Sequence, residues 1–113
     1  MRYHHKVKID LREYIDLRGH NHYREWAHAL DSGERARVIK SVLRMGEGNL
    51  SGVKPEGEGV SALRIDFGPG YRIYYGREGA VAYLLISGGD KSTQKADIKR
   101  AKEMWKTIKK ESS

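Results

Sequence analysis

The 113-residue chain contains no cysteine. Disulfide scaffolds, thiol nucleophiles and cysteine-ligated zinc are therefore excluded as its structural or chemical basis. No stretch approaches the ~20 apolar residues that a membrane-spanning helix needs, and the segment Met1–Tyr14 has no apolar core of a secretion signal. We therefore expect a cytoplasmic protein with no membrane partner.

Acidic residues are also scarce relative to basic ones. The chain has 22 Lys and Arg against 15 Asp and Glu, a net charge of +7. A surplus of this size favours a polyanionic partner such as RNA, DNA or an acidic protein, although solubility alone would explain it too. The length suits one hydrophobic core, so we expect a single domain over residues 1–113.

Sequence signatures of phosphate loops and metal sites are missing. The glycine-rich strings GPG (68–70) and SGGDKS (87–92) lack the spacing of a nucleotide-binding P-loop. The adjacent pair His4 and His5 would chelate a metal poorly from a strand, and we expect His20 and His22, which fall in a turn, to be structural or incidental. The sequence thus predicts no metal and no cofactor.

Hydrophobic periodicity changes along the first half of the chain. Alternation over Lys6–Tyr14 predicts a strand with one buried face, and the spacing of apolar residues from His22 to Leu30 predicts an amphipathic helix. Asp31 or Ser32 is placed to cap a second helix that ends near 46–48. The short break between the two helices predicts an antiparallel helical hairpin.

Three strands are predicted in the second half, after a glycine-rich loop over Asn49–Gly59. They cover Leu63–Phe67, Tyr71–Tyr75 and Val81–Ile86, with turns at 68–70 and 77–79. The third strand is the most apolar, so we expect it at the centre of the sheet.

A helix capped by Ser92 follows, because apolar residues recur there at helical spacing: Ile98, Ala101, Met104, Trp105 and Ile108. The element order predicts an α+β fold. We expect a small antiparallel β-sheet packed against the N-terminal helical hairpin and the C-terminal helix, with the helices on one face.

Arginines on the predicted sheet are the first candidates for a site. If the turn at 68–70 contains an odd number of residues, Arg64, Asp66, Arg72 and Tyr74 share one face of the sheet. Guanidinium groups bind phosphate through two parallel hydrogen bonds, and Tyr74 would stack on a base or move a proton. The alternative is a solvated face on which Asp66 pairs with an arginine and Tyr74 is half exposed.

Lysines lie at both ends of this segment. Lys54 precedes the three strands and Lys91 follows them, so both could reach over the arginines and stabilise charge on a phosphate. The basic face of the last helix would bind RNA or simply be solvated. Its candidates are Lys95, Lys99, Arg100 and Lys102.

The order of three motifs, VKP (53–55), LRIDFGPGYR (63–72) and GGDKSTQKADI (88–98), resembles the addiction-module killer proteins. These are members of the RelE/ParE toxin superfamily, in the phage Gp49-like or HigB-like branch. The resemblance covers Val53 to Trp105, roughly half the chain. It implies the toxin of a type II toxin–antitoxin pair, with a small antiparallel sheet against two N-terminal helices and a C-terminal helix.

The resemblance also implies an activity. Such toxins enter the ribosome and cut mRNA without a metal, through attack of a ribose 2′-OH on the adjacent phosphate. Arg64 and Arg72 would hold the phosphate, and Lys54 or Lys91 would stabilise the developing charge. Tyr74 would stack a base or help move a proton. The implied partner is a cognate antitoxin, a small helix-turn-helix protein.

The end of the chain, MWKTIKKESS (104–113), departs from this family. It has neither the histidine nor the tyrosine that better-known family nucleases use there, so the general base stays open between Glu56, Glu58 and Asp90. Two other readings remain: a ParE-like toxin that inhibits DNA gyrase, and a non-catalytic module that binds an anionic partner.

Overall fold

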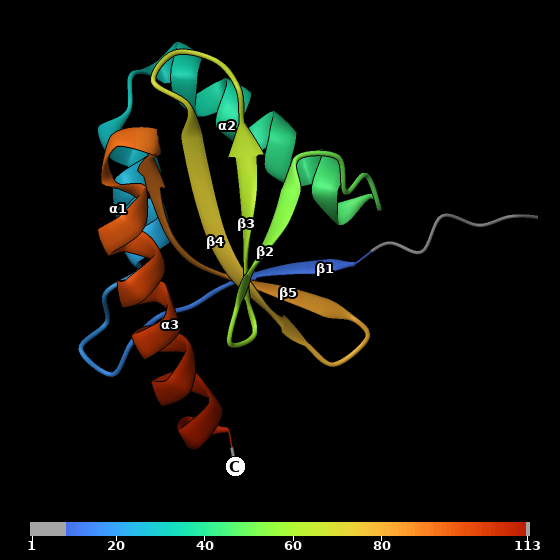
Figure 1. The fold of residues 1–113 in the computed structure, drawn as a ribbon, viewed down its shortest axis with the longest axis vertical. Helices are drawn as coiled ribbons and strands as arrows, with labels where there is room; N and C mark the ends of the chain where they lie inside the picture. Colours follow the sequence, from blue (N-terminus) through green and yellow to red (C-terminus); the bar gives the residue numbers. More distant parts are fainter. Residues whose placement is uncertain (1–8, 113) are drawn as a thin grey trace, which may run out of the picture.

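Five strands and three α-helices make up the computed structural model, which describes residues 9–112 (Figure 1). The strands are β1 (Asp10–Glu13), β2 (Val53–Gly57), β3 (Val60–Ile65), β4 (Tyr71–Glu78) and β5 (Ala82–Asp90). The helices are α1 (His22–Ala29), α2 (Ser32–Gly46) and α3 (Gln94–Glu111), with the short 3₁₀ turn η1 (Lys91–Thr93) before α3. The predicted α+β class is confirmed.

The strands form one mixed sheet in the order β1-β5-β4-β3-β2. The expectation of a purely antiparallel sheet is wrong, because β1 pairs parallel with β5. Alternation in a short segment predicts a strand but contains no information about its direction. The central strand is β4 rather than β5, and the turn between them lies at 79–81, two residues later than predicted.

Residues 53–57, predicted as part of a loop, form the edge strand β2. Lys54 pairs with Ala62 and Pro55 with Ser61, and the register shifts after Pro55. Proline has no N–H to donate and is tolerated at a sheet edge. Glu58 and Gly59, with φ angles of 54° and 85°, close the tight turn to β3.

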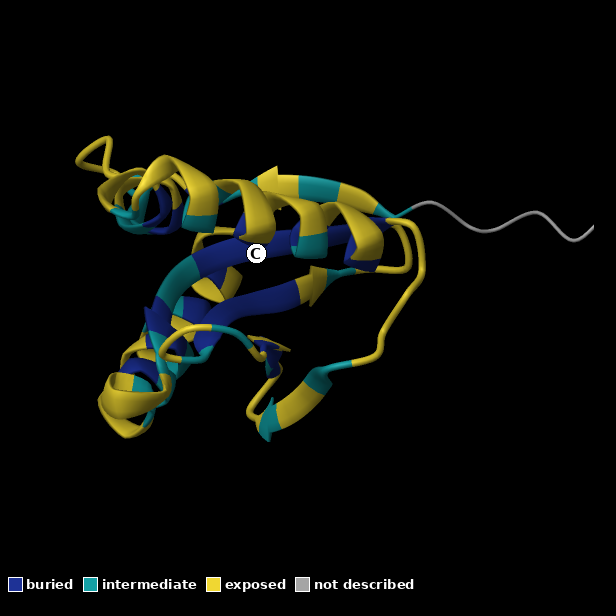
Figure 2. Ribbon diagram, turned by 90° about the horizontal axis from the view of Figure 1, so that it is seen from above, coloured by how far each residue is buried: buried dark blue, intermediate teal, exposed yellow. Residues whose placement is uncertain are grey.

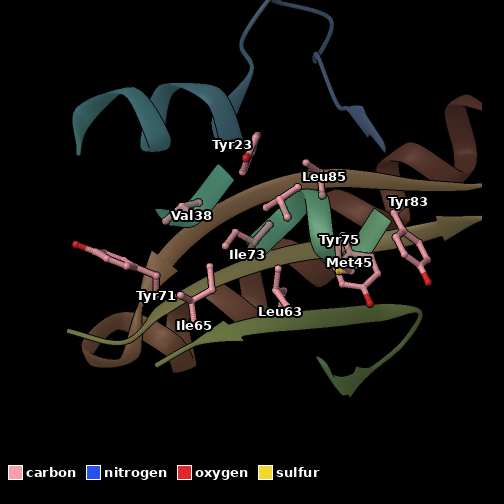
Figure 3. Packing of buried hydrophobic residues seen from close by; sticks show 11 residues of the cluster. Tyr23, Val38, Met45, Leu63, Ile65, Tyr71, Ile73, Tyr75, Tyr83 and Leu85 are labelled. Carbon is pink, nitrogen blue, oxygen red and sulfur yellow. The ribbon is translucent and has the colours of Figure 1, made fainter. Parts of the chain in front are cut away.

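Helices cover both faces of the sheet, not one face as expected (Figure 2). Successive strand residues point to opposite faces, so the sheet supplies two cores. The core under α1 and α2 is drawn in Figure 3 and includes Tyr23, Val38, Met45, Ile73 and Leu85. The core under α3 contains Val60, Ala62, Tyr74, Leu84, Ile86, Ala101, Trp105 and Ile108.

Side-chain caps set the starts of two helices. Asn21 caps α1, and the predicted capping of α2 by Asp31 is confirmed, since its carboxylate accepts from the Glu34 N–H at 2.9 Å. The predicted capping by Ser92 is wrong: Asp90 caps η1 by accepting from the Ser92 N–H. Within residues 9–112, no helix combines the length and the apolar character that crossing a bilayer requires.

Candidate functional site

A small pocket lies on the α3 side of the sheet, where β2, β3 and β4 meet the start of α3. Its volume is about 100 Å³. We call it the cationic pocket, and its lining residues are Lys54, Glu56, Ala62, Arg64, Arg72, Lys91 and Gln94. All four basic residues predicted around a phosphate are therefore brought together.

The register of β3 and β4 places the two arginines. Arg64 lies directly opposite Arg72, and Leu63 opposite Ile73. The loop over residues 66–70 contains an odd number of residues, as the shared face required, so the arginines point away from the core under α1 and α2. The strand register confirms that Arg64, Arg72 and Tyr74 share one face, whereas Asp66, predicted on the same face, lies in the loop after β3.

Arg72 is buried, with an exposed fraction of only 7%. Its Nε donates to Oε1 of Gln94 at 2.8 Å, and its Nη1 donates to the Tyr71 carbonyl at 3.1 Å. Neither partner is charged, and no carboxylate of residues 9–112 forms a salt bridge with this guanidinium. The two bonds orient Arg72, and its Nη2 amine makes no hydrogen bond within residues 9–112.

Arg64 is exposed and is held against the loop before β2. Its Nε donates to the Gly52 carbonyl at 3.2 Å, and its backbone N–H donates to the same oxygen at 3.0 Å. Gly52 has a φ of 86°, and an added Cβ would lie 2.9 Å from the Arg64 carbonyl oxygen. Asp66 makes no ion pair with either arginine in residues 9–112, contrary to the solvated-face alternative.

Tyr74 is fully buried beneath α3, with an exposed fraction of 0%. The prediction that the Tyr74 ring stacks on a base is therefore wrong. Its hydroxyl makes no hydrogen bond within the described residues. Burial, and then the charges of Asp97 and Glu56, raise the pKa of Tyr74 to about 12, so the hydroxyl stays protonated at neutral pH.

Three carboxylates were candidates for the general base, and the structure separates them. Glu56 lines the cationic pocket. Glu58 lies 3.5 Å from Nζ of Lys102 and 3.6 Å from Nζ of Lys106. Asp90 accepts hydrogen bonds from Ser92, whose hydroxyl and N–H lower the pKa of Asp90. Of the three, only Glu56 lines the cationic pocket.

The basic residues of α3 do not form one surface. Lys95, Lys99 and Lys102 follow one stripe, because steps of four and three residues return to the same side of a helix. Arg100 lies away from this stripe and pairs with Asp97 at 3.7 Å. The four residues therefore lie on two sides of α3, and their binding of RNA stays a prediction.

Two of the five histidines have structural contacts, as expected. Nε2 of His22 lies 3.1 Å from Asp16, and Nδ1 of His20 lies 3.2 Å from Glu25. Both pairs are in and beside the loop between β1 and α1. His4 and His5 lie outside the described residues.

Gln94 is the site residue that sequence reasoning missed. It is the first residue of α3, and its amide oxygen is what orients Arg72. The sequence feature that could have indicated a role for Gln94 is its position three residues after Lys91, at the start of a helix that faces the arginines. An uncharged side chain with a positioning role has no pattern of its own in the sequence.

Comparison with known proteins gives one informative match. No family model matches the chain. An uncharacterized protein of Haemophilus influenzae is 43% identical over 68 residues, which are 60% of this chain and 69% of that protein. The two proteins belong to the same family. The relative's name states no activity.

Proposed function

We propose that the protein is the toxin of a type II toxin–antitoxin system and cleaves mRNA on the ribosome without a metal. The observation that carries this proposal is the meeting of Lys54, Arg64, Arg72 and Lys91 around one small pocket. Arg72 is held there by two uncharged partners. The resemblance of the motifs over 53–105 to RelE/ParE toxins supports the same conclusion.

The pocket residues suit a phosphodiester cleavage in which the RNA supplies its own nucleophile. Glu56 accepts the proton of the ribose 2′-OH, whose oxygen then attacks the adjacent phosphorus. The bond to the 5′ oxygen breaks, and Lys54 or Lys91 protonates that oxygen. The products are a 2′,3′-cyclic phosphate and a 5′-hydroxyl. Arg64 and Arg72 stabilise the charge that develops on the phosphate.

The proposed partner is a small helix-turn-helix antitoxin that holds the toxin inactive. The cationic pocket and the lysine stripe of α3 (Lys95, Lys99, Lys102) both lie on the α3 side of the sheet. An acidic segment of the antitoxin would cover this surface and compete with RNA.

Mapping of mRNA 5′ ends after brief induction in bacterial cells tests the proposal. We expect new ends within translated codons for the wild-type protein and for the control variant Arg18→Gln. Arg18 is an exposed residue of the loop before α1 and does not line the cationic pocket. Arg72→Ala should produce none. Toxicity with intact messages and relaxed or broken DNA would instead indicate gyrase inhibition.

A further inference from the structure

A second polar pocket adjoins the cationic pocket on the other side of Arg64. Its volume is about 110 Å³, and we call it the loop pocket. Its lining residues are Ser41, Arg44, Asn49, Ser51, Leu63 and Arg64. Arg64 is the one residue that lines both pockets, so a chain lying across its side chain would enter both.

The loop over 47–52 is held to the rest of the fold by backbone hydrogen bonds at both of its ends. At one end, the Asn49 N–H donates to the Arg44 carbonyl at 3.0 Å. At the other end, the Gly52 carbonyl accepts from both the backbone N–H and Nε of Arg64. The loop is thus hydrogen-bonded at one end to α2 and at the other to β3, the two elements that carry Arg44 and Arg64.

The polar groups of the loop pocket are arranged to donate hydrogen bonds. Oδ1 of Asn49 accepts from the N–H of Ser51 at 3.0 Å and from its hydroxyl at 2.7 Å. Because these bonds engage the Asn49 oxygen, the amine of this side chain is the group that remains as a donor. Arg44 and Arg64 add two guanidinium groups, and no carboxylate is among the lining residues. Such a donor set fits an anion.

We infer that the loop pocket binds a second phosphate of the RNA strand, next to the phosphate that is cut. This inference rests on the proposed function. The cavity suits a phosphate group rather than a whole nucleotide, since pockets for larger ligands reach about 300 Å³ or more. Arg64 contacts both phosphates, whereas Arg44 contacts only the second, and so acts as a binding residue outside the chemical step.

Binding of a 2′-O-methyl hexanucleotide, which cannot be cut, tests the inference when one phosphate at a time is replaced by a neutral methylphosphonate. For the wild-type protein we expect weaker binding at two neighbouring linkages. Arg44→Gln should weaken binding of the unmodified strand about tenfold. It should also abolish the methylphosphonate effect at one linkage only. Arg64→Gln should reduce the effect at both, and Arg18→Gln should leave both unchanged.

The salt dependence gives a second measurement. Loss of one phosphate contact lowers the slope of log affinity against log salt by about 0.7 for single strands. We expect this decrease for Arg44→Gln and not for Arg18→Gln. Since Arg44 is exposed on α2, its replacement should leave the unfolding temperature unchanged, which the same samples can show.

The possible outcomes distinguish failure of the second-phosphate site from failure of the proposed mRNA cleavage. If Arg44→Gln weakens binding by the same factor whichever linkage is neutral, the methylphosphonate effect is retained at every linkage. The second-phosphate site is then wrong, while cleavage in the cationic pocket stands. If the wild-type protein does not bind the strand at all, the second-phosphate site is overturned as well. If Arg72→Ala still cuts mRNA in cells, the proposed function itself fails.

Discussion

Arg64 and Arg72 face each other directly across the β3–β4 pair, and neither makes an ion pair with a carboxylate of the described chain. Like charges directly opposite on neighbouring strands destabilise a sheet. The free protein therefore carries an electrostatic cost at this position, and an anion bound between the two guanidinium groups would relieve it.

We therefore expect inorganic phosphate to stabilise the protein against heat. A ligand at ten times its dissociation constant contributes about 1.4 kcal/mol, which corresponds to an increase of several degrees in the unfolding temperature. Scanning calorimetry at constant ionic strength, with chloride as the comparison anion, measures this increase. Arg64→Gln should lose most of it, and Arg18→Gln should keep it. An equal increase in both variants would contradict a specific site.

Gln94 should prove to be a positioning residue for Arg72. Gln94→Ala removes the hydrogen bond to Nε, and the resulting misplacement should slow single-turnover cleavage about 10- to 100-fold. Gln94→Glu keeps the hydrogen bond but neutralises Arg72 and repels the phosphate, so it should slow cleavage further while the unfolding temperature stays at or above that of the wild type. Wild-type activity in Gln94→Glu would show that the charge of Arg72 is not used.

Two buried tyrosines should respond differently to removal of the hydroxyl. The Tyr74 hydroxyl has no partner within the described residues, whereas the Tyr71 hydroxyl donates to Glu34 at 2.6 Å. Tyr74→Phe should leave the free energy of unfolding unchanged or raise it by up to about 1 kcal/mol, and Tyr71→Phe should lower it by about 1–2 kcal/mol. Urea denaturation measures both. Loss of cleavage in a fully stable Tyr74→Phe would restore a chemical role for this hydroxyl.

The same tyrosines predict the behaviour at alkaline pH. The hydrogen bond to Glu34 raises the pKa of Tyr71 to about 12, and burial raises that of Tyr74 to about 12, from an ordinary value of 10. A folded-state pKa above the unfolded-state value gives a stabilisation that is complete below pH 10 and is lost as the pH rises toward 12. Unfolding free energies measured across this range should fall, and should fall less steeply in Tyr74→Phe than in the wild type.

Periodicity predicted the elements whose pattern is local. The spacing of Tyr23, Trp26, Ala27 and Leu30 sets α1, and the alternation around Arg64 and Arg72 sets the register of β3 with β4. The edge strand β2 escaped prediction because Lys54-Pro55-Glu56 has no apolar alternation. Its pairing depends on the turn at Glu58 and Gly59, where both φ angles are positive.

The basic residues of the site could be predicted from the sequence, but the packing of α3 against them could not. Arg64 and Arg72 meet because the alternation of β3 and β4 puts them on one face of the sheet, and Lys54 and Lys91 join them from β2 and from the turn after β5. The burial of Tyr74 depends on α3, where Trp105 lies so close to Gly76 that an added Cβ would be 2.4 Å from the ring. A contact between segments so far apart in the chain leaves no local signature, and the same is true of the bond between Arg72 and Gln94.

Glu58 should restrain the lysines of α3 rather than take part in cleavage. Its carboxylate pairs with Lys102 and Lys106, and the side chain is 53% exposed. Exposed pairs contribute about 0–1 kcal/mol, so Glu58→Gln should change the free energy of unfolding by less than about 0.5 kcal/mol. The freed charges should strengthen RNA binding and steepen its salt dependence. Glu56→Gln, which also removes one negative charge, is the matched comparison, because it should abolish cleavage whereas Glu58→Gln should not. Loss of cleavage in Glu58→Gln with normal RNA binding would move the general base from Glu56 to Glu58.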